Sequence, residues 1–143
     1  MTTSTKPATW FWVVSGIALL WNLLGVAAYL SQVSMSPEAV QALPEQQRAI
    51  IESTPSWATG AFAIAVWGGA LGSILLLLRK SFATWALLVS FAGIVVQMVH
   101  AFFMSNSIEV YGPGGMVMPI MVLLIGAYLI WFARQSSSKG WLN

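Results

Sequence analysis

The sequence predicts an all-α integral membrane protein built as a bundle of four transmembrane helices. Two observations carry this fold class. Hydrophobic residues make up 58% of the 143 residues and charged residues only 7%, whereas a soluble domain carries roughly 25% charged residues. The few charges also leave four long uncharged stretches between them. This composition excludes a cytosolic enzyme and a nucleic-acid-binding protein, and the absence of cysteine excludes a disulfide-stabilised secreted domain.

The uncharged stretches define the helices. A helix needs about 20 apolar residues to cross the hydrocarbon core, because its backbone groups must be satisfied internally. Each stretch is long enough to cross the membrane once and too short to cross it twice. The stretches are residues 7–37, 53–78, 81–108 and 110–133. We therefore expect a single transmembrane domain, residues 1–143, with helices at about 10–32, 57–78, 82–105 and 115–133.

The charges also predict the orientation. Five cations lie before the first helix, between the second and third, or after the fourth: Lys6, Arg79, Lys80, Arg134 and Lys139. All four glutamates lie in the other two connections, together with Arg48. Because Lys and Arg in short loops remain on the cytoplasmic side, both termini are expected in the cytoplasm. The alternative for residues 1–27 is a cleaved signal peptide, but this stretch is too long and too rich in tryptophan for one.

The connection between the first two helices, residues 36–53, is expected to be helical and amphipathic. Ser36, Pro37 and Glu38 provide an N-cap, an N1 proline and a first-turn acid. Pro44 cannot continue that helix and starts a second one. We expect this segment to lie on the outer membrane surface, and a lid or docking surface is the alternative.

Small residues recur at every fourth position of the second helix: Ala61, Ala65, Gly69 and Ser73. Such a stripe allows two helix backbones to approach closely in lipid. Packing within the chain is the favoured interpretation. The alternatives are contact with a second copy, which gives a homo-oligomer, or with a larger membrane complex.

Four polar residues are candidates for ligand binding. Asn22 and Gln97 each lie twelve residues beyond a tryptophan at a helix end, and an amide facing lipid is costly, so both should point inward. Hydrogen bonds between helices are the alternative role for them. His100 is the only histidine and shares a helical face with Gln97 and Met104. Tyr111 belongs to the Gly/Pro-rich connection before the fourth helix.

No catalytic constellation or cofactor motif is visible, so we expect no enzyme and leave the cofactor unknown. The chain has no Asp or Cys, and no Glu inside a predicted helix. Methionines gather at the outer ends of the third and fourth helices, where thioether and imidazole ligands would suit Cu(I); the residues concerned are His100, Met104, Met118 and Met121. Apolar packing by methionine is the favoured interpretation, so no metal site is expected.

Four segments resemble a family of small four-span bacterial inner-membrane proteins of unestablished function, some of which are labelled as sugar transporters. The segments are residues 20–25, 42–45, 57–63 and 110–115. The resemblance covers nearly the whole chain and implies a bacterial inner membrane. The resulting expectation is a protein that binds or transports a small molecule through an outward-facing pocket. The alternative is an accessory subunit that docks onto a larger complex through the small-residue stripe.

Overall fold

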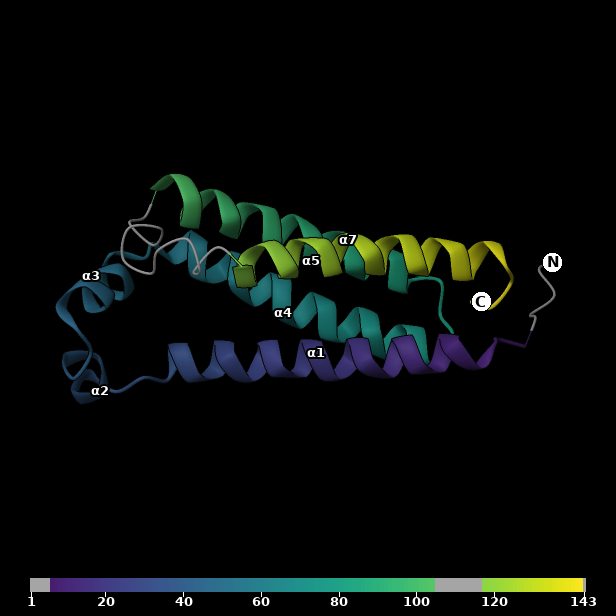
Figure 1. The fold of residues 1–143 in the computed structure, drawn as a ribbon, viewed down its shortest axis with the longest axis horizontal. Coiled ribbons are helices and arrows are strands. Elements are labelled where there is room, and N and C mark those ends of the chain that lie inside the picture. Colours follow the sequence, from purple (N-terminus) through teal and green to yellow (C-terminus); the bar gives the residue numbers. More distant parts are fainter. Residues whose placement is uncertain (1–5, 105–116, 143) are drawn as a thin grey trace.

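The computed structural model describes residues 6–104 and 117–142, and every regular element among them is helical. The long helices are α1 (Thr9–Val33), α4 (Ser56–Leu77), α5 (Ala83–Val99) and α7 (Val117–Ser138), and α5 continues as the π-helix η1 (His100–Met104). Four helices, with α5 and η1 counted as one, are long and apolar enough to cross a membrane. The expected all-helical fold is therefore confirmed for the described residues. Figure 1 shows the long helices lying side by side.

The two short helices α2 (Pro37–Gln41) and α3 (Glu45–Ser53) connect α1 to α4 at one end of the bundle (Figure 1). The side chain of Ser36 accepts a hydrogen bond from the backbone N–H of Ala39 at 3.1 Å. This is the N-cap bond that the sequence predicts for α2. No residue of α2 or α3 is buried, so both helices lie on the surface of the chain.

The end of α7 differs from the sequence-based expectation. The helix continues to Ser138, five residues beyond the expected end at 133, because Arg134 marks the limit of the apolar stretch but does not stop a helix. The stop comes at Gly140, which has a φ of 78°. The backbone N–H of Trp141 donates to Ser136 O at 2.9 Å, and that of Gly140 donates to Ser137 O at 3.1 Å. These bonds form a Schellman C-cap.

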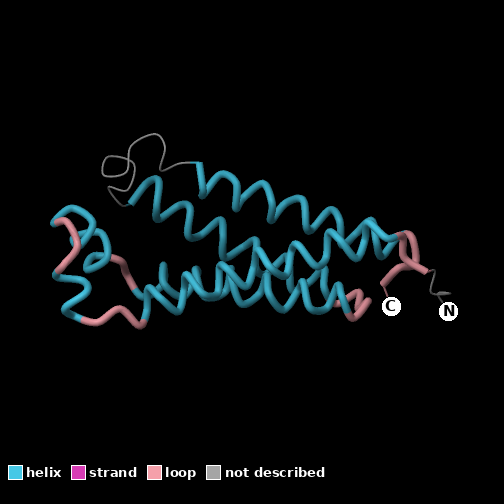
Figure 2. The backbone as a smooth tube through the Cα atoms, turned by 60° about the horizontal axis from the view of Figure 1, so that its bottom comes forward, coloured by secondary structure: helices cyan, strands magenta, loops and turns pink. Residues whose placement is uncertain are grey.

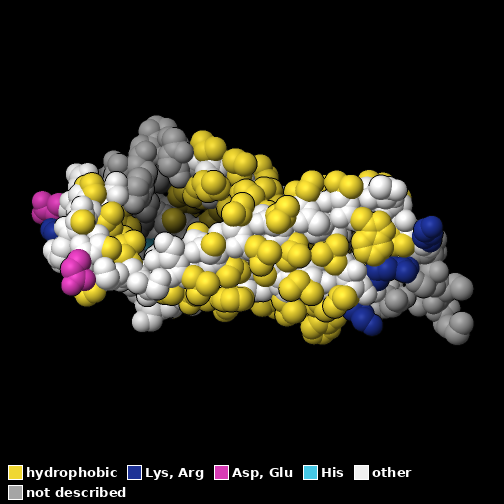
Figure 3. Space-filling model, turned by 90° about the horizontal axis from the view of Figure 1, so that it is seen from below, with side chains coloured by type: hydrophobic (Ala, Val, Ile, Leu, Met, Phe, Trp, Pro, Cys, Tyr) yellow, Lys and Arg dark blue, Asp and Glu magenta, His cyan; other side chains and the backbone are white. Residues whose placement is uncertain are grey.

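The charged side chains separate to the two ends of the bundle. We call the end with Arg79, Lys80, Arg134 and Lys139 the basic end, and the end with α2 and α3 the acidic end. Figure 3 shows Lys and Arg at one end, Asp and Glu with one cation at the other, and mostly hydrophobic side chains between them. Helix α1 begins and α7 ends at the basic end (Figure 1).

Helix α4 occupies the centre of the packing. It contacts α1 on one side and α5 on the other, and α5 in turn contacts α7. Figure 2 shows the same bundle from another direction. The small residues make this packing close. All four members of the predicted stripe on α4 are buried: Ala61, Ala65, Gly69 and Ser73. At Gly93 of α5, an added Cβ would lie 2.8 Å from Ala61 O and 3.0 Å from Ala65 N.

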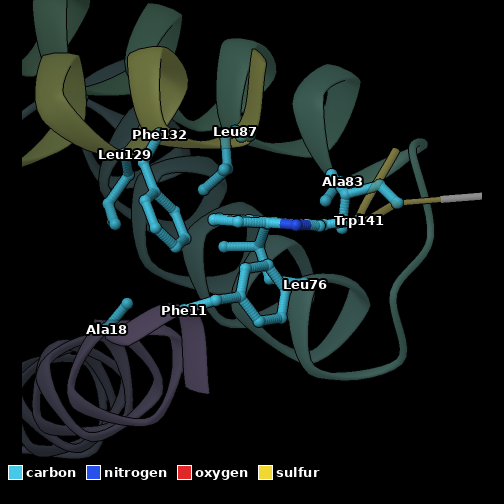
Figure 4. Packing of buried hydrophobic residues seen from close by; sticks show 10 residues of the cluster. Phe11, Ala18, Leu76, Ala83, Leu87, Leu129, Phe132 and Trp141 are labelled. Carbon is cyan, nitrogen blue, oxygen red and sulfur yellow. The ribbon is translucent and has the colours of Figure 1, made fainter. Parts of the chain in front are cut away.

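The largest cluster of buried residues closes the basic end. The rings of Phe11 and Phe132 stack with centroids 5.6 Å apart, and Trp141 contacts Phe11 at 5.7 Å. Figure 4 shows Trp141 inserted among Phe11, Leu76 and Phe132. The ammonium group of Lys139 lies 4.8 Å from the Trp141 ring centroid. The chain after α7 is thus folded back into the bundle, where it joins α1 to α7.

Arg79 couples the turn between α4 and α5 to this cluster. Its φ of 59° makes it the left-handed residue at the C-cap of α4, a conformation that is unfavourable for a non-glycine residue. The backbone N–H of Lys80 donates to Leu75 O at 2.8 Å, and the Arg79 Nε donates to Trp141 O at 2.9 Å. The arginine side chain therefore holds the two C-caps of the basic end together.

The close packing of α4 and α5 gives a stability prediction. Gly93→Ala should lower the free energy of unfolding by about 1–3 kcal/mol, because the new Cβ presses against the backbone of α4. Gly60→Ala is the matched control, since nothing lies within 4 Å of the added Cβ. It should be neutral or slightly stabilising. Thermal unfolding in one detergent compares the two variants, and equal midpoints would contradict this packing.

Candidate functional site

A cavity of about 430 Å³ lies among the four long helices. Helices α1, α4, α5 and α7 all contribute to its wall, as does Ala101 of η1. Among the described residues of the wall, most side chains are apolar and none is charged. The polar side chains of the wall are Asn22, Ser90 and Gln97, together with the indole of Trp21. The cavity is therefore suited to an uncharged, mostly apolar molecule.

The cavity ends at the cluster of the basic end. Leu87 and Leu129 belong both to the cavity wall and to that cluster. At a rise of 1.5 Å per residue, Asn22 lies about 20 Å from the start of α1 and Gln97 about 21 Å from the start of α5. The two starts are not level, because Asn22 packs against Gly69 and Ser73 of α4, whereas Gln97 lies one turn beyond Gly93, which packs against Ala61 and Ala65. Gln97 therefore lines the cavity nearer the acidic end than Asn22 does.

The Asn22 side chain is fixed by the protein. Its Nδ2 donates to Ala18 O at 2.8 Å and to Ser73 Oγ at 3.2 Å. A backbone carbonyl can only accept, so this contact defines which end of the amide is nitrogen. The Oδ1 lies over Gly69, where an added Cβ would overlap it. Asn22 therefore fastens α1 to α4 at the cavity wall.

The Gln97 side chain differs from that of Asn22 in its hydrogen bonding. It lines the cavity and is only partly buried, and no described residue forms a hydrogen bond with its side-chain amide. The two amide hydrogens and the carbonyl oxygen thus need partners from outside the described protein groups. Buried polar groups are normally hydrogen-bonded, and water is scarce inside a membrane. This amide is the feature of the wall that packing does not explain.

The sequence predicts that His100 shares the pocket with Gln97, but the structure places the two side chains apart. The imidazole does not line the cavity and instead meets the ring of Trp57 edge-on, with centroids 5.5 Å apart. The reason is helical geometry. His100 follows Gly93 by seven residues, or two turns, so it lies on the face of α5 that packs against α4.

The remaining candidate residues are only partly described. Tyr111 and the side chain of Met104 lie outside the described residues. Met118 lines the cavity, whereas Met121 and His100 do not. Within residues 6–104 and 117–142, no three His, Cys, Asp or Glu side chains come together as a metal site. The Cu(I) interpretation therefore gains no support from the described part of the chain.

Trp21 was missed by the sequence analysis as a cavity residue. Trp21 lies well inside the apolar stretch of α1, far from the helix ends, and lines the cavity. A tryptophan far from both interfaces, next to a buried amide, was the available signal. Met98 and Pro119 also line the cavity, and their sequence context gave no such signal.

The chain matches no protein-family model, no curated protein and no solved structure. The resemblance to small four-span bacterial membrane proteins therefore stays a prediction.

Apolar replacement of Asn22 and of Gln97 should have different effects on the stability of the protein. Asn22→Leu should lower the free energy of unfolding by about 0.6–2 kcal/mol, because it removes the hydrogen bond to Ser73 that joins α1 to α4. Gln97→Met, which also keeps the side-chain size, should leave stability unchanged or raise it, because no protein bond is lost. Denaturant unfolding in detergent measures the free energy of unfolding of both variants. A loss at Gln97 as large as that at Asn22 would contradict the distinction.

Proposed function

We propose that this protein resides in the inner membrane of a bacterium and binds a small, mostly apolar molecule between its four long helices. The observation that carries the proposal is Gln97, which lines the cavity and whose amide has no hydrogen-bond partner among the described residues. A ligand that reaches this amide would satisfy it, and the apolar wall would bind the rest of the molecule. The described residues of the wall carry no charged side chain, which favours an uncharged ligand, since an isolated ion there would lack a counter-charge from them.

The proposed topology has both termini and the α4–α5 turn in the cytoplasm. The basic end holds the start of α1, the end of α7 and this turn. Cations in short connections favour the cytoplasmic side. Helices α2 and α3 would then lie on the outer membrane surface, where their exposed apolar side chains can contact the lipid headgroup region.

Binding is favoured over the role of an accessory subunit. The small-residue stripe on α4 is buried against α1 and α5, so it offers no free surface to a larger complex. We therefore propose binding as the function, with transport as an extension of it.

Single cysteines test the topology, because the chain has none of its own. A membrane-impermeant maleimide should label Gln46→Cys on α3 in intact spheroplasts. It should label Ser138→Cys at the end of α7 only after permeabilisation. Both positions are exposed, so access to the reagent decides the result. Labelling of Ser138→Cys in intact spheroplasts would contradict the proposed orientation.

Filling the cavity should remove the ligand and leave the fold intact. Val122 of α7 lines the cavity, whereas Leu124 on the same helix is 63% exposed and does not. Native mass spectrometry of protein released gently from its membrane should detect an added mass on the wild type and on Leu124→Phe. Val122→Phe should lose that mass while keeping its helical circular dichroism. An identical added mass on both variants, or none on the wild type, would reject the binding function.

A further inference from the structure

The cavity has an opening between α1 and α7. These two helices meet through aromatic side chains at the basic end, where Phe11 stacks on Phe132. Farther from that end no extended backbone contact joins them, in contrast to the other neighbouring pairs. Both helices nevertheless line the cavity there. We call this line of separation between α1 and α7 the α1–α7 seam.

Residues along the seam belong to the cavity and to the outer surface at once. Leu24 of α1 is 69% exposed and Met118 of α7 is 58% exposed, and both line the cavity. A side chain can line the cavity and also be exposed only where the cavity reaches the surface. At 1.5 Å per residue, Leu24 lies about 22 Å from the start of α1, which is inside a hydrocarbon core about 30 Å thick. At this height, in the proposed membrane, the seam faces lipid and not water.

The Gln97 amide specifies the head of the ligand. Both hydrogens of Asn22 Nδ2 are donated to the protein and its Oδ1 packs on Gly69, so Asn22 serves the contact between α1 and α4. Gln97 offers both amide hydrogens and an acceptor to the cavity. A hydroxyl group can donate to Gln97 Oε1 or accept from Gln97 Nε2. A carboxylate cannot donate, and a hydrocarbon can do neither.

We infer that the cavity takes a neutral lipid with a free hydroxyl group, and that this lipid passes directly from the bilayer through the α1–α7 seam. The inference rests on the proposed function and adds the ligand class and its route. The apolar tail lies along the cavity and seam, and the hydroxyl group reaches Gln97. No covalent chemistry is involved.

Three probes with equal chain length test the head group in lipid nanodiscs: 1-hexadecanol, hexadecanoate and hexadecane. Native mass spectrometry should find 1-hexadecanol bound about ten-fold more tightly than either of the other two, as expected for hydrogen bonds made without water. Gln97→Met should remove this preference. Equal binding of the three probes, or an unchanged preference in Gln97→Met, would overturn the hydroxyl assignment.

Matched double variants test the route. The pair Leu24→Trp with Ala28→Trp narrows the seam, because both residues line the cavity and are exposed. The pair Leu23→Trp with Ala27→Trp adds the same bulk at the same height, on exposed positions that do not line the cavity. Exchange of bound 1-hexadecanol for its deuterated form should slow about ten-fold or more in the first pair only, since a narrowed passage raises the barrier to exchange. Met118→Trp should slow it from the other side of the seam.

The outcomes of these experiments distinguish a failure of the proposed binding function from a failure of the lateral route. If the wild type binds no probe and carries no lipid, the proposed function fails together with this inference. If 1-hexadecanol binds but exchanges at the same rate in the seam variants and the control pair, the lateral route is wrong and the binding function stands. If the first pair fails to bind any probe, Met118→Trp decides the route, because normal exchange in that variant also rejects it.

Discussion

The close approach of α4 to both of its neighbours is the constraint on which the rest of the structure depends. Gly69 makes room for the Asn22 amide on one side of α4, and Gly93 places α5 against the α4 backbone on the other. Apolar side chains gain little from leaving lipid, so such contacts between small residues hold helices together in a membrane. Because α1 packs on α4 and α7 packs on α5, α1 and α7 are not drawn together along their whole length. The cavity occupies the space that this arrangement leaves.

The basic end sets the limit of that space. Two Schellman caps, the bond from Arg79 to Trp141 O and the stacking of Phe11 on Phe132 join all four long helices there. The same interactions explain why a non-glycine residue tolerates a positive φ at Arg79, since its side chain is bonded in return. The bundle is therefore tied at one end, while α1 and α7 separate toward the other. This asymmetry closes the cavity at the basic end and leaves it open between α1 and α7.

The fold could be predicted from the sequence because lipid imposes simple rules. Charges can lie only at the ends of the apolar stretches, so they locate α1 and α4 to within one residue. The end of α7 was not predicted because its signal was Gly140, which follows the helix, and not a charge. The cost of an amide in lipid predicted that Asn22 and Gln97 face inward, and they do line one cavity. His100 was misplaced because neighbours on one helical face can still contact different helices, and only the packing at Gly93 shows which face meets α4. The α1–α7 seam depends on the mutual placement of helices, which no local pattern encodes.

The most direct test of this account is an experimental structure of the protein in a lipid nanodisc, at a resolution that shows side chains and bound lipid. We expect α1 and α7 to remain apart above the Phe11–Phe132 contact. An elongated density should lie in the cavity, with its polar end within hydrogen-bonding distance of Gln97. A map in which α7 packs along α1 and the Gln97 amide bonds to another protein group would contradict the account.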